Sequence, residues 1–241
     1  AQISGISEER IKAFARAVAH AQRPCLIAGE WLTESSMREK LAGAVHNLAL
    51  LGSLYEKGQI GLLARAANSK GAKKLGAVPH PMPGLIEKMR QTWGEYPDVP
   101  GLASDRMIRA SVKQELDSLF IVGANPMLTM PDGQFVREGL EKLDFLVVAD
   151  LYESETTQMA DVVLPLSCWA EYGDRFVNLE GRVQEFQDAI KPLGQSRPGY
   201  LIVNDLAAQL KSPLFIEKSK FADEVDTFLN ENSVMPVPET L

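Results

Sequence analysis

The sequence is poor in cysteine and histidine, the residues that most often hold metal ions. Of its 241 residues, two are cysteine and three are histidine. Cys25 and Cys168 lie far apart and neither belongs to a Cys-x-x-Cys pair. This chain alone therefore supplies no disulfide framework, structural zinc site or cysteine-ligated iron–sulfur cluster. We expect Cys25, within an apolar run, to be a small core residue, and Cys168 to be partly exposed.

Basic residues are also in the minority. The 25 lysines and arginines face 32 acidic residues, which gives a formal net charge of −7. An acidic chain is a poor platform for nucleic acid and for an anionic membrane surface. The longest apolar run without a formal charge, from Leu41 to Tyr55, is shorter than the roughly 20 residues that a membrane-spanning helix needs. We predict neither a nucleic-acid partner nor a membrane span.

Several well-known functional motifs are missing as well. The sequence contains no GxGxxG, P-loop, HExxH or GxSxG pattern. Its histidines, His20, His46 and His80, have no Asp or Cys at the spacing of metal ligands, so a structural role is favoured for them. Motifs alone thus predict no catalytic residue and no metal ligand.

What is present is an alternation of short apolar runs and helical stretches, in a chain that is 45% hydrophobic and 24% charged, as globular proteins are. Helices of about 10–15 residues between strands indicate βαβ units. We predict an α/β fold, a mostly parallel Rossmann-like sheet flanked by helices, with strands buried on both faces. The expected strands are 25–29, 59–65, 118–123, 145–149 and 161–165, and the expected helices include 34–51, 107–115, 134–143, a short one at 156–159, and an amphipathic one near the C-terminus. Asn68 to Ala72 is expected to be a polar loop.

Three loops follow expected strands, at residues 123–126, 150–157 and 166–173. In open α/β sheets, ligands bind outside the carboxyl ends of the strands. Pro126 should force residue 125 out of the helical region, and an acid such as Asp150 can accept hydrogen bonds from a ribose or a guanine edge. The alternative is that Asp150 is a solvated turn residue and that Ser154 only caps the next helix.

An ordered series of segments resembles the molybdopterin oxidoreductase family over nearly the whole chain. The series comprises Leu119–Pro126, Leu143–Asp150, Glu155–Thr156, Ala160–Pro165, Glu171, Gly173, Asn178 and residues 180–184, preceded by Arg23-Pro24, Asn68-x-x-Gly71-Ala72, Pro83-Gly84 and Trp93-Gly94. The resemblance implies a fragment of a formate dehydrogenase-like domain. Residues 1–56 would end a first α/β lobe, residues 57–215 would form a second, and residues 216–241 would be a C-terminal helix and tail.

In catalytic members of this family, strand-end loops hold a molybdopterin guanine dinucleotide. The resemblance places that role, or a vestige of it, on five positions of this sequence: Gly123, Asn125, Asp150, Thr156 and Asp161. It places no catalytic residue and no metal ligand here. Missing from this chain are the family's N-terminal cluster cysteines, its metal-ligand segment and its C-terminal β-barrel. Because the chain also begins at Ala1 without a methionine, we expect it to be a piece of a longer protein.

Residues 67–72 make the chain most similar to the G-subunit branch of the family, from bacterial NADH:quinone oxidoreductase (respiratory complex I). This resemblance implies a non-catalytic structural domain without a cofactor of its own. It would pack against the rest of its subunit and other subunits of an electron-transport complex, at the cytoplasmic side of the inner membrane. The parent's iron–sulfur clusters would lie in an absent N-terminal part. One alternative is a fragment of a catalytic enzyme, such as a formate dehydrogenase or nitrate reductase, that binds molybdopterin guanine dinucleotide. Another is a free-standing small-molecule binding domain.

One further expectation concerns Arg182. Its guanidinium suits a carboxylate, and Glu171 and Glu180 are the nearest candidates in the sequence. We therefore expect an ion pair that clamps the loops after residue 166. The alternative is a solvated surface arginine.

Overall fold

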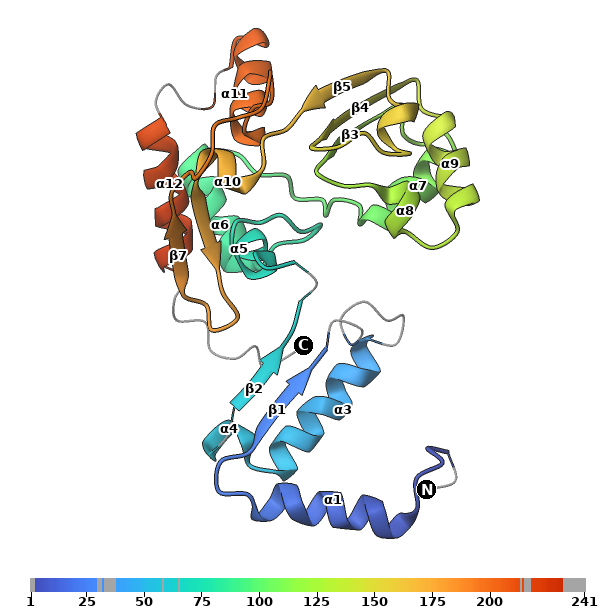
Figure 1. The fold of residues 1–241 in the computed structure, drawn as a ribbon, viewed down its shortest axis with the longest axis vertical. Coiled ribbons are helices and arrows are strands. Elements are labelled where there is room, and N and C mark those ends of the chain that lie inside the picture. Colours follow the sequence, from blue (N-terminus) through green and yellow to red (C-terminus); the bar gives the residue numbers. More distant parts are fainter. Residues whose placement is uncertain are drawn as a thin grey trace. The chain divides into compact units, whose positions relative to one another are not determined.

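The computed structural model describes residues 3–29, 32, 38–57, 59–64, 66–212, 214 and 218–231 (Figure 1). The described chain divides into two compact units. The first contains the residues up to 71 together with residues 177–182, and the second contains residues 72–176 and 183–231. The lobe limits at residues 56 and 215 stay a prediction.

The first unit is built on two parallel strands, β1 (Cys25–Ala28) and β2 (Gln59–Leu62). Its helices are α1 (Glu8–His20), α3 (Arg38–Leu51) and α4 (Leu54–Lys57). The expected helix 34–51 is thus seen from Arg38, and residues 34–37 lie outside the described residues. Cys25 is exposed. The expectation of a core cysteine is wrong, because this sheet of two strands leaves the Cys25 side chain without cover.

The second unit is centred on three parallel strands in the order β3 (Ser118–Val122), β4 (Phe145–Asp150) and β5 (Val162–Pro165). Two helices, α7 (Ser104–Val112) and α9 (Gly133–Glu141), lie on one side of this sheet (Figure 1). The predicted parallel α/β topology of residues 118–165 is confirmed.

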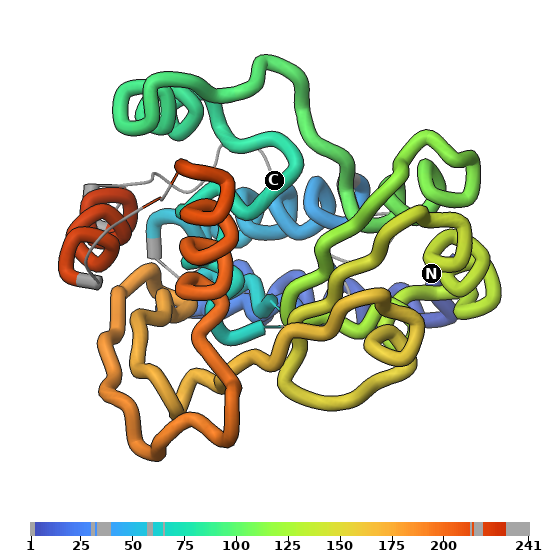
Figure 2. The backbone as a smooth tube through the Cα atoms, turned by 90° about the horizontal axis from the view of Figure 1, so that it is seen from above, coloured from blue at the N-terminus to red at the C-terminus, as the bar shows by residue number. Residues whose placement is uncertain are grey.

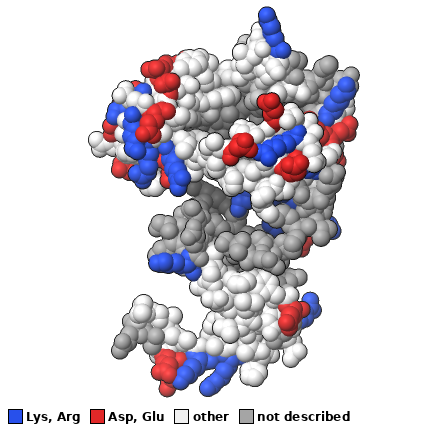
Figure 3. Space-filling model, turned by 180° about the vertical axis from the view of Figure 1, so that it is seen from behind, with Lys and Arg blue, Asp and Glu red and all other residues white. Residues whose placement is uncertain are grey.

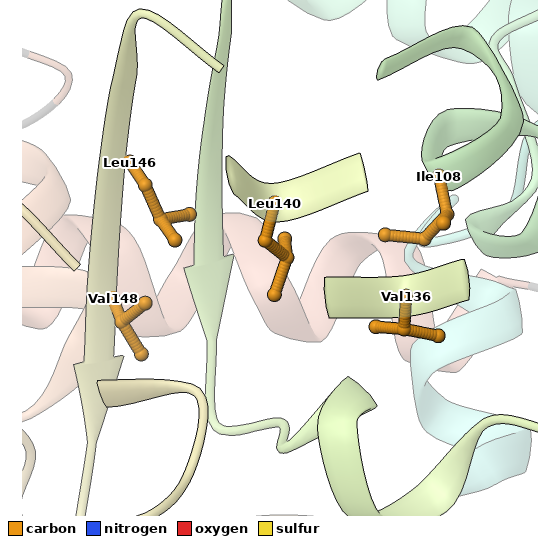
Figure 4. Packing of buried hydrophobic residues seen from close by; sticks show 5 residues of the cluster. All are labelled: Ile108, Val136, Leu140, Leu146 and Val148. Atoms are coloured by element: carbon orange, nitrogen blue, oxygen red, sulfur yellow. The ribbon is translucent and has the colours of Figure 1, made fainter. Parts of the chain in front are cut away.

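A tight apolar cluster joins these helices to the central strand. Its five members are at most 4% exposed. They point toward one another between α7, α9 and β4 (Figure 4): Ile108, Val136, Leu140, Leu146 and Val148. Burying side chains of this size contributes about 1.5–3 kcal/mol each, so this cluster fixes the sheet that positions the loops beyond it.

The expectation that the strands are buried on both faces holds for only part of the sheets. In β4, Leu146, Val148 and Ala149 are at most 2% exposed, but Phe120 in β3 is 42% exposed and Val163 in β5 is 49% exposed. The expectation of fully buried strands is therefore wrong for β1, β3 and β5. Phe120 and Val163 lie on opposite faces, because Val163 pairs in register with Val148 and Phe120 with Val147, so the described helices leave part of the sheet exposed on both faces.

The remaining elements of the second unit are largely helical. They are α5 (Ser69–Lys74), which begins in the first unit, α6 (Pro83–Trp93), α10 (Trp169–Tyr172), the paired strands β6 (Asp174–Val177) and β7 (Val183–Phe186), α11 (Gly199–Gln209) and α12 (Lys218–Glu231). The polar loop expected at Asn68 to Ala72 is a helix from Ser69 onward. The Asn68 side chain, just before this helix, accepts a hydrogen bond at Oδ1 from Val177 N at 2.9 Å.

The expected amphipathic C-terminal helix is confirmed as α12, with Phe228 and Leu229 at most 3% exposed. It lies beside α11 (Figures 1 and 2), where the rings of Tyr200 and Phe221 stack at 4.8 Å. Lys88 Nζ donates to the carbonyl of Thr227 at 2.7 Å and Lys74 Nζ to that of Leu229 at 3.2 Å. Lysines from α5 and α6 therefore satisfy carbonyls in the last turns of α12.

Charged side chains of both signs are interspersed on the face of the molecule that Figure 3 shows. At the end of α9, for example, the C-cap residue Lys142 pairs with Glu138 at 2.7 Å. Among the described residues, no helix is long and apolar enough to cross a membrane.

Candidate functional site

A pocket of about 670 Å³ opens at the carboxyl ends of β3 and β4. Two loops form it, the one that follows Val122 and the one that follows Asp150. Its lining residues are Gly123, Ala124, Asn125, Leu128, Asp150, Tyr152, Glu153, Ser154, Glu155 and Gln158. This is the sheet edge at which the sequence predicts a ligand site.

The first loop turns sharply and is held to the neighbouring strand. Gly123 has φ +59° and its N–H donates to the carbonyl of Ala149 at 2.8 Å. Such a positive φ suits glycine. Asn125, at φ −115°, stands outside the helical region, and Pro126 begins α8 (Pro126–Thr129). The predicted effect of Pro126 on residue 125 is confirmed.

Asn125 joins the two loops through its side-chain amide. Its Nδ2 donates to Glu155 Oε2 at 2.8 Å, and its Oδ1 accepts from Thr156 Oγ1 at 2.7 Å. Thr156 is completely buried, and its Oγ1 also accepts from Met127 N at 3.3 Å. Thr156 therefore satisfies an N–H of the first turn of α8 from the opposite loop.

The same amide keeps a carboxylate ionised at the pocket wall. The hydrogen bond from Asn125, and after it a bond from the backbone, hold the pKa of Glu155 below its ordinary value. The Glu155 side chain is exposed, so its charge faces solvent or a ligand.

The second loop contains a local capping motif. Ser154 Oγ accepts from Thr157 N at 3.3 Å, and Thr157 Oγ1 donates to the carbonyl of Ser154 at 2.9 Å. Ser154 thus accepts from the first N–H of the short helix η1 (Thr157–Met159), whose N-cap residue is Thr156. One oxygen of Asp150 accepts from Leu151 N at 2.8 Å, while the residue also lines the pocket.

The structure brings four of the five predicted positions together. Gly123, Asn125 and Asp150 line the pocket, and Thr156 supports its wall from behind. Asp161 lies at the other end of the strands, at their amino ends, because it immediately precedes β5. There its Oδ2 accepts from Leu146 N at 2.7 Å.

Other lining residues were not singled out from the sequence. Glu155 belongs to the predicted loop, but its bond to Asn125 spans 30 residues and leaves no local signal. Tyr152 and Leu128 are 79% and 72% exposed, and they give the pocket an apolar wall. Exposed residues of these types in a loop carry no recognisable pattern in a single sequence.

The charge of the pocket restricts what it can hold. Asp150, Glu153 and Glu155 contribute carboxylates, and no lysine or arginine is among its described lining residues. Carboxylates accept hydrogen bonds from N–H and O–H groups, and they repel phosphates. Within the described residues, no three His, Cys, Asp or Glu side chains cluster as metal ligands would. The pocket suits a ligand portion that is uncharged and rich in donors.

The clamp expected at Arg182 is not found. Arg182 is exposed, and its side chain has no ion pair within the described part of the chain. Glu171 instead accepts from two backbone N–H groups, those of Cys168 at 2.7 Å and Leu193 at 2.9 Å. These bonds, the Cys168 one most strongly, lower the pKa of Glu171. The loops after residue 166 are thus joined by a carboxylate and backbone donors.

Comparison with known proteins gives a consistent answer. A family model described as molybdopterin oxidoreductase matches residues 9–209. The chain is 34% identical over 218 residues to the F420-dependent formate dehydrogenase subunit alpha of Methanocaldococcus jannaschii, covering 87% of this chain and 32% of that protein. It is 30% identical over 198 residues to a G-type NADH-quinone oxidoreductase subunit of Rhizobium meliloti, covering 78% of this chain and 23% of that protein. The chain therefore spans a third or less of the length of these two relatives.

Proposed function

The chain belongs to the molybdopterin oxidoreductase family, and from that premise we propose that its strand-end pocket holds the nucleoside end of a molybdopterin guanine dinucleotide. The supporting observation is the donor-accepting wall formed by Asp150 and Glu155, with the Asn125 bridge fixing Glu155 in its ionised state. Guanine and ribose present N–H and O–H groups that match such a wall.

The fit extends to the nucleoside and not to the rest of the cofactor. The described lining has no cation that could stabilise a pyrophosphate. The described residues also offer no metal-ligand cluster. When bound, the cofactor would supply redox chemistry from its metal end. Gly123, Asn125, Asp150, Glu155 and Thr156 would bind and orient its other end.

In this proposal the chain is the cofactor-binding part of a larger oxidoreductase subunit of the formate dehydrogenase kind. The formate dehydrogenase relative is 34% identical to this chain and the G-type relative 30%. Partners would be the rest of the same polypeptide and the other proteins of its complex, because both relatives are named as subunits.

The second candidate is a non-catalytic domain of a G-type NADH:quinone oxidoreductase subunit, at the cytoplasmic side of the membrane. Two observations favour it: the 30% identity with the G-type relative, and the absence of a basic lining residue, among those described, for the pyrophosphate. In this case the pocket is a vestige and binds no nucleotide.

The test is a calorimetric titration of the chain with guanosine and with adenosine. We expect guanosine to bind more tightly, because the N1–H and N2 amino groups of guanine both donate to carboxylates. Glu155→Gln should weaken guanosine binding about tenfold. Asp144→Asn, an exposed carboxylate at the other sheet edge, is the control and should change nothing.

Equal binding of both nucleosides, or equal effects of the two variants, would contradict the proposal. The two candidates are separated by analysing the full-length protein for molybdenum and for the fluorescent oxidation products of pterin. Their presence in stoichiometric amounts supports the enzyme, and their absence beside bound iron supports the non-catalytic G-type domain.

A further inference from the structure

Two large apolar side chains line the strand-end pocket, one from each of its loops. Leu128 comes from the first loop and is 72% exposed, and Tyr152 comes from the second and is 79% exposed. A single exposed apolar residue on a protein surface needs no explanation. Here two of them line the same pocket as three carboxylates, so the pocket combines apolar surface with hydrogen-bond acceptors.

The backbone on either side of Tyr152 is held by hydrogen bonds. Before it, Leu151 N donates to Asp150 Oδ1 at 2.8 Å, and after it, Ser154 N donates to Thr157 Oγ1 at 2.7 Å. Thr157 is only 6% exposed, so the second bond ties the loop to the buried part of the unit. Tyr152 therefore extends from a loop that is held at both ends, and ordering its side chain on a ligand restricts only two χ angles.

The Tyr152 side chain makes no hydrogen bond and no ring contact within the described part of the chain. Its ring is thus available to the flat face of a ligand. The carboxylates of Asp150 and Glu155 accept hydrogen bonds at the edge of a base, but they offer nothing to its face. A tyrosine ring does, because aromatic side chains stack on the π-face that every nucleobase has.

We propose that Tyr152 is the stacking residue of this pocket, and that it gives affinity for a planar base without distinguishing one base from another. This role rests on the proposed nucleoside site and deepens it. Selectivity for guanine comes from the carboxylates, through Glu155, because bases differ in the donors and acceptors at their edges. Affinity for the face of the base comes from Tyr152, and Leu128 adds apolar contact.

The experiment titrates guanosine and adenosine into three variants of the chain. Tyr152→Ala should weaken the binding of both nucleosides about tenfold, and by the same factor, because stacking tolerates any base. Tyr152→Phe keeps the ring and should bind within about twofold of the unaltered chain. Leu210→Ala is the control and should change neither affinity, since Leu210 is 81% exposed at the end of α11 and does not line the pocket. All three side chains are changed at exposed positions, so the urea midpoints should stay the same.

A direct signature comes from the five tyrosines of the chain, labelled as 3-fluorotyrosine. The ¹⁹F resonance of Tyr152, assigned by its loss in Tyr152→Phe, should move upfield when guanosine is added, because the ring current of a stacked purine shields nuclei above its plane. The remaining tyrosines are internal controls whose resonances should not move: Tyr55, Tyr96, Tyr172 and Tyr200. A merely structural role for Tyr152 would leave its resonance unchanged.

Failure of the stacking role and failure of the proposed function give different results. Preferential guanosine binding that Tyr152→Ala leaves unchanged, or a Tyr152 resonance that does not move, overturns the stacking role and leaves the guanine assignment intact. Equal binding of both nucleosides that Tyr152→Ala weakens equally supports the stacking role and contradicts the guanine assignment. A preference for guanosine that disappears in Tyr152→Ala shows that the ring selects between bases, and it overturns the proposal. Absence of binding by either nucleoside overturns both.

Discussion

Replacing Thr156 by valine should destabilise the second unit although the two side chains have the same shape. Thr156 is completely buried, and its hydroxyl makes two bonds, one to Asn125 Oδ1 at 2.7 Å and one from Met127 N at 3.3 Å. Valine leaves the N–H in the first turn of α8 without its acceptor. An unsatisfied buried polar group costs about 1–3 kcal/mol. In a chain of this size, about 2 kcal/mol lowers Tm by roughly 4–8 °C.

The matched control is Thr129→Val. The Thr129 hydroxyl also bonds to Asn125, donating to its backbone carbonyl at 2.9 Å, but it does so in an exposed position. Its loss should therefore change the free energy of unfolding by less than about 0.5 kcal/mol. Urea unfolding followed by tryptophan fluorescence measures both variants. If the urea midpoints of Thr156→Val and Thr129→Val move by the same amount, burial of the hydroxyl does not determine the loss of stability. The reasoning about the Asn125 bridge is then refuted.

Three further outcomes are expected. Gly173→Ala should lower the free energy of unfolding by about 3 kcal/mol, because a Cβ at φ +59° would lie 2.8 Å from backbone atoms at the end of β7. Gly181→Ala, with open space around it, should lower it by about 1 kcal/mol. Equal urea midpoints for the two variants would contradict this. Asn125→Ala should raise the pKa of Glu155 toward its ordinary value, because the largest lowering cause is removed while the backbone hydrogen bond remains. The stabilisation by the ionised carboxylate, present above the unfolded-state pKa and lost as the pH falls through the lower folded pKa, should therefore become smaller; carboxyl NMR titration checks the direction, and an unchanged pKa would exclude the bridge as its main cause. Arg175→Ala should cost about 2 kcal/mol in urea unfolding, because that side chain is 19% exposed and its Nε pairs with an α12 carboxylate at 2.7 Å; a loss below about 0.5 kcal/mol would place this pair with solvated surface pairs.

The central strands could be predicted from the sequence almost to the residue. Runs such as Leu119 to Val122 are continuously apolar and end at a glycine, a pattern that few other structures share. Strands β6 and β7 were missed because Asp174–Val177 and Val183–Phe186 are short and contain charges. Tertiary contacts hold them, among them the Arg175 pairs with Glu185 and Asp226, and such contacts leave no local pattern.

The location of the pocket could be predicted from the sequence, but the hydrogen bonds between its two loops could not. The rule that ligands lie beyond the carboxyl ends of strands led directly to Gly123 and Asp150. The same rule, applied to which end of a strand a residue occupies, would have separated Asp161 from the other four positions, since it precedes its strand. The link between Asn125 and Glu155 depends on how two loops approach each other in space, which strand patterns do not specify.

The attachment of α12 has a consequence for how the protein emerges from the ribosome. The indole N–H of Trp93, at the end of α6, donates to Glu224 of α12 at 2.7 Å, across 131 residues of sequence. At about 5–20 residues per second, the ribosome takes roughly 7–26 s to make that intervening chain. During this interval α6 lacks its α12 contacts, among them the ring of Phe228, whose centroid lies 5.5 Å from that of Trp93 in the finished fold. Until α12 emerges, the Trp93 side of α6 is therefore a surface that a chaperone could bind.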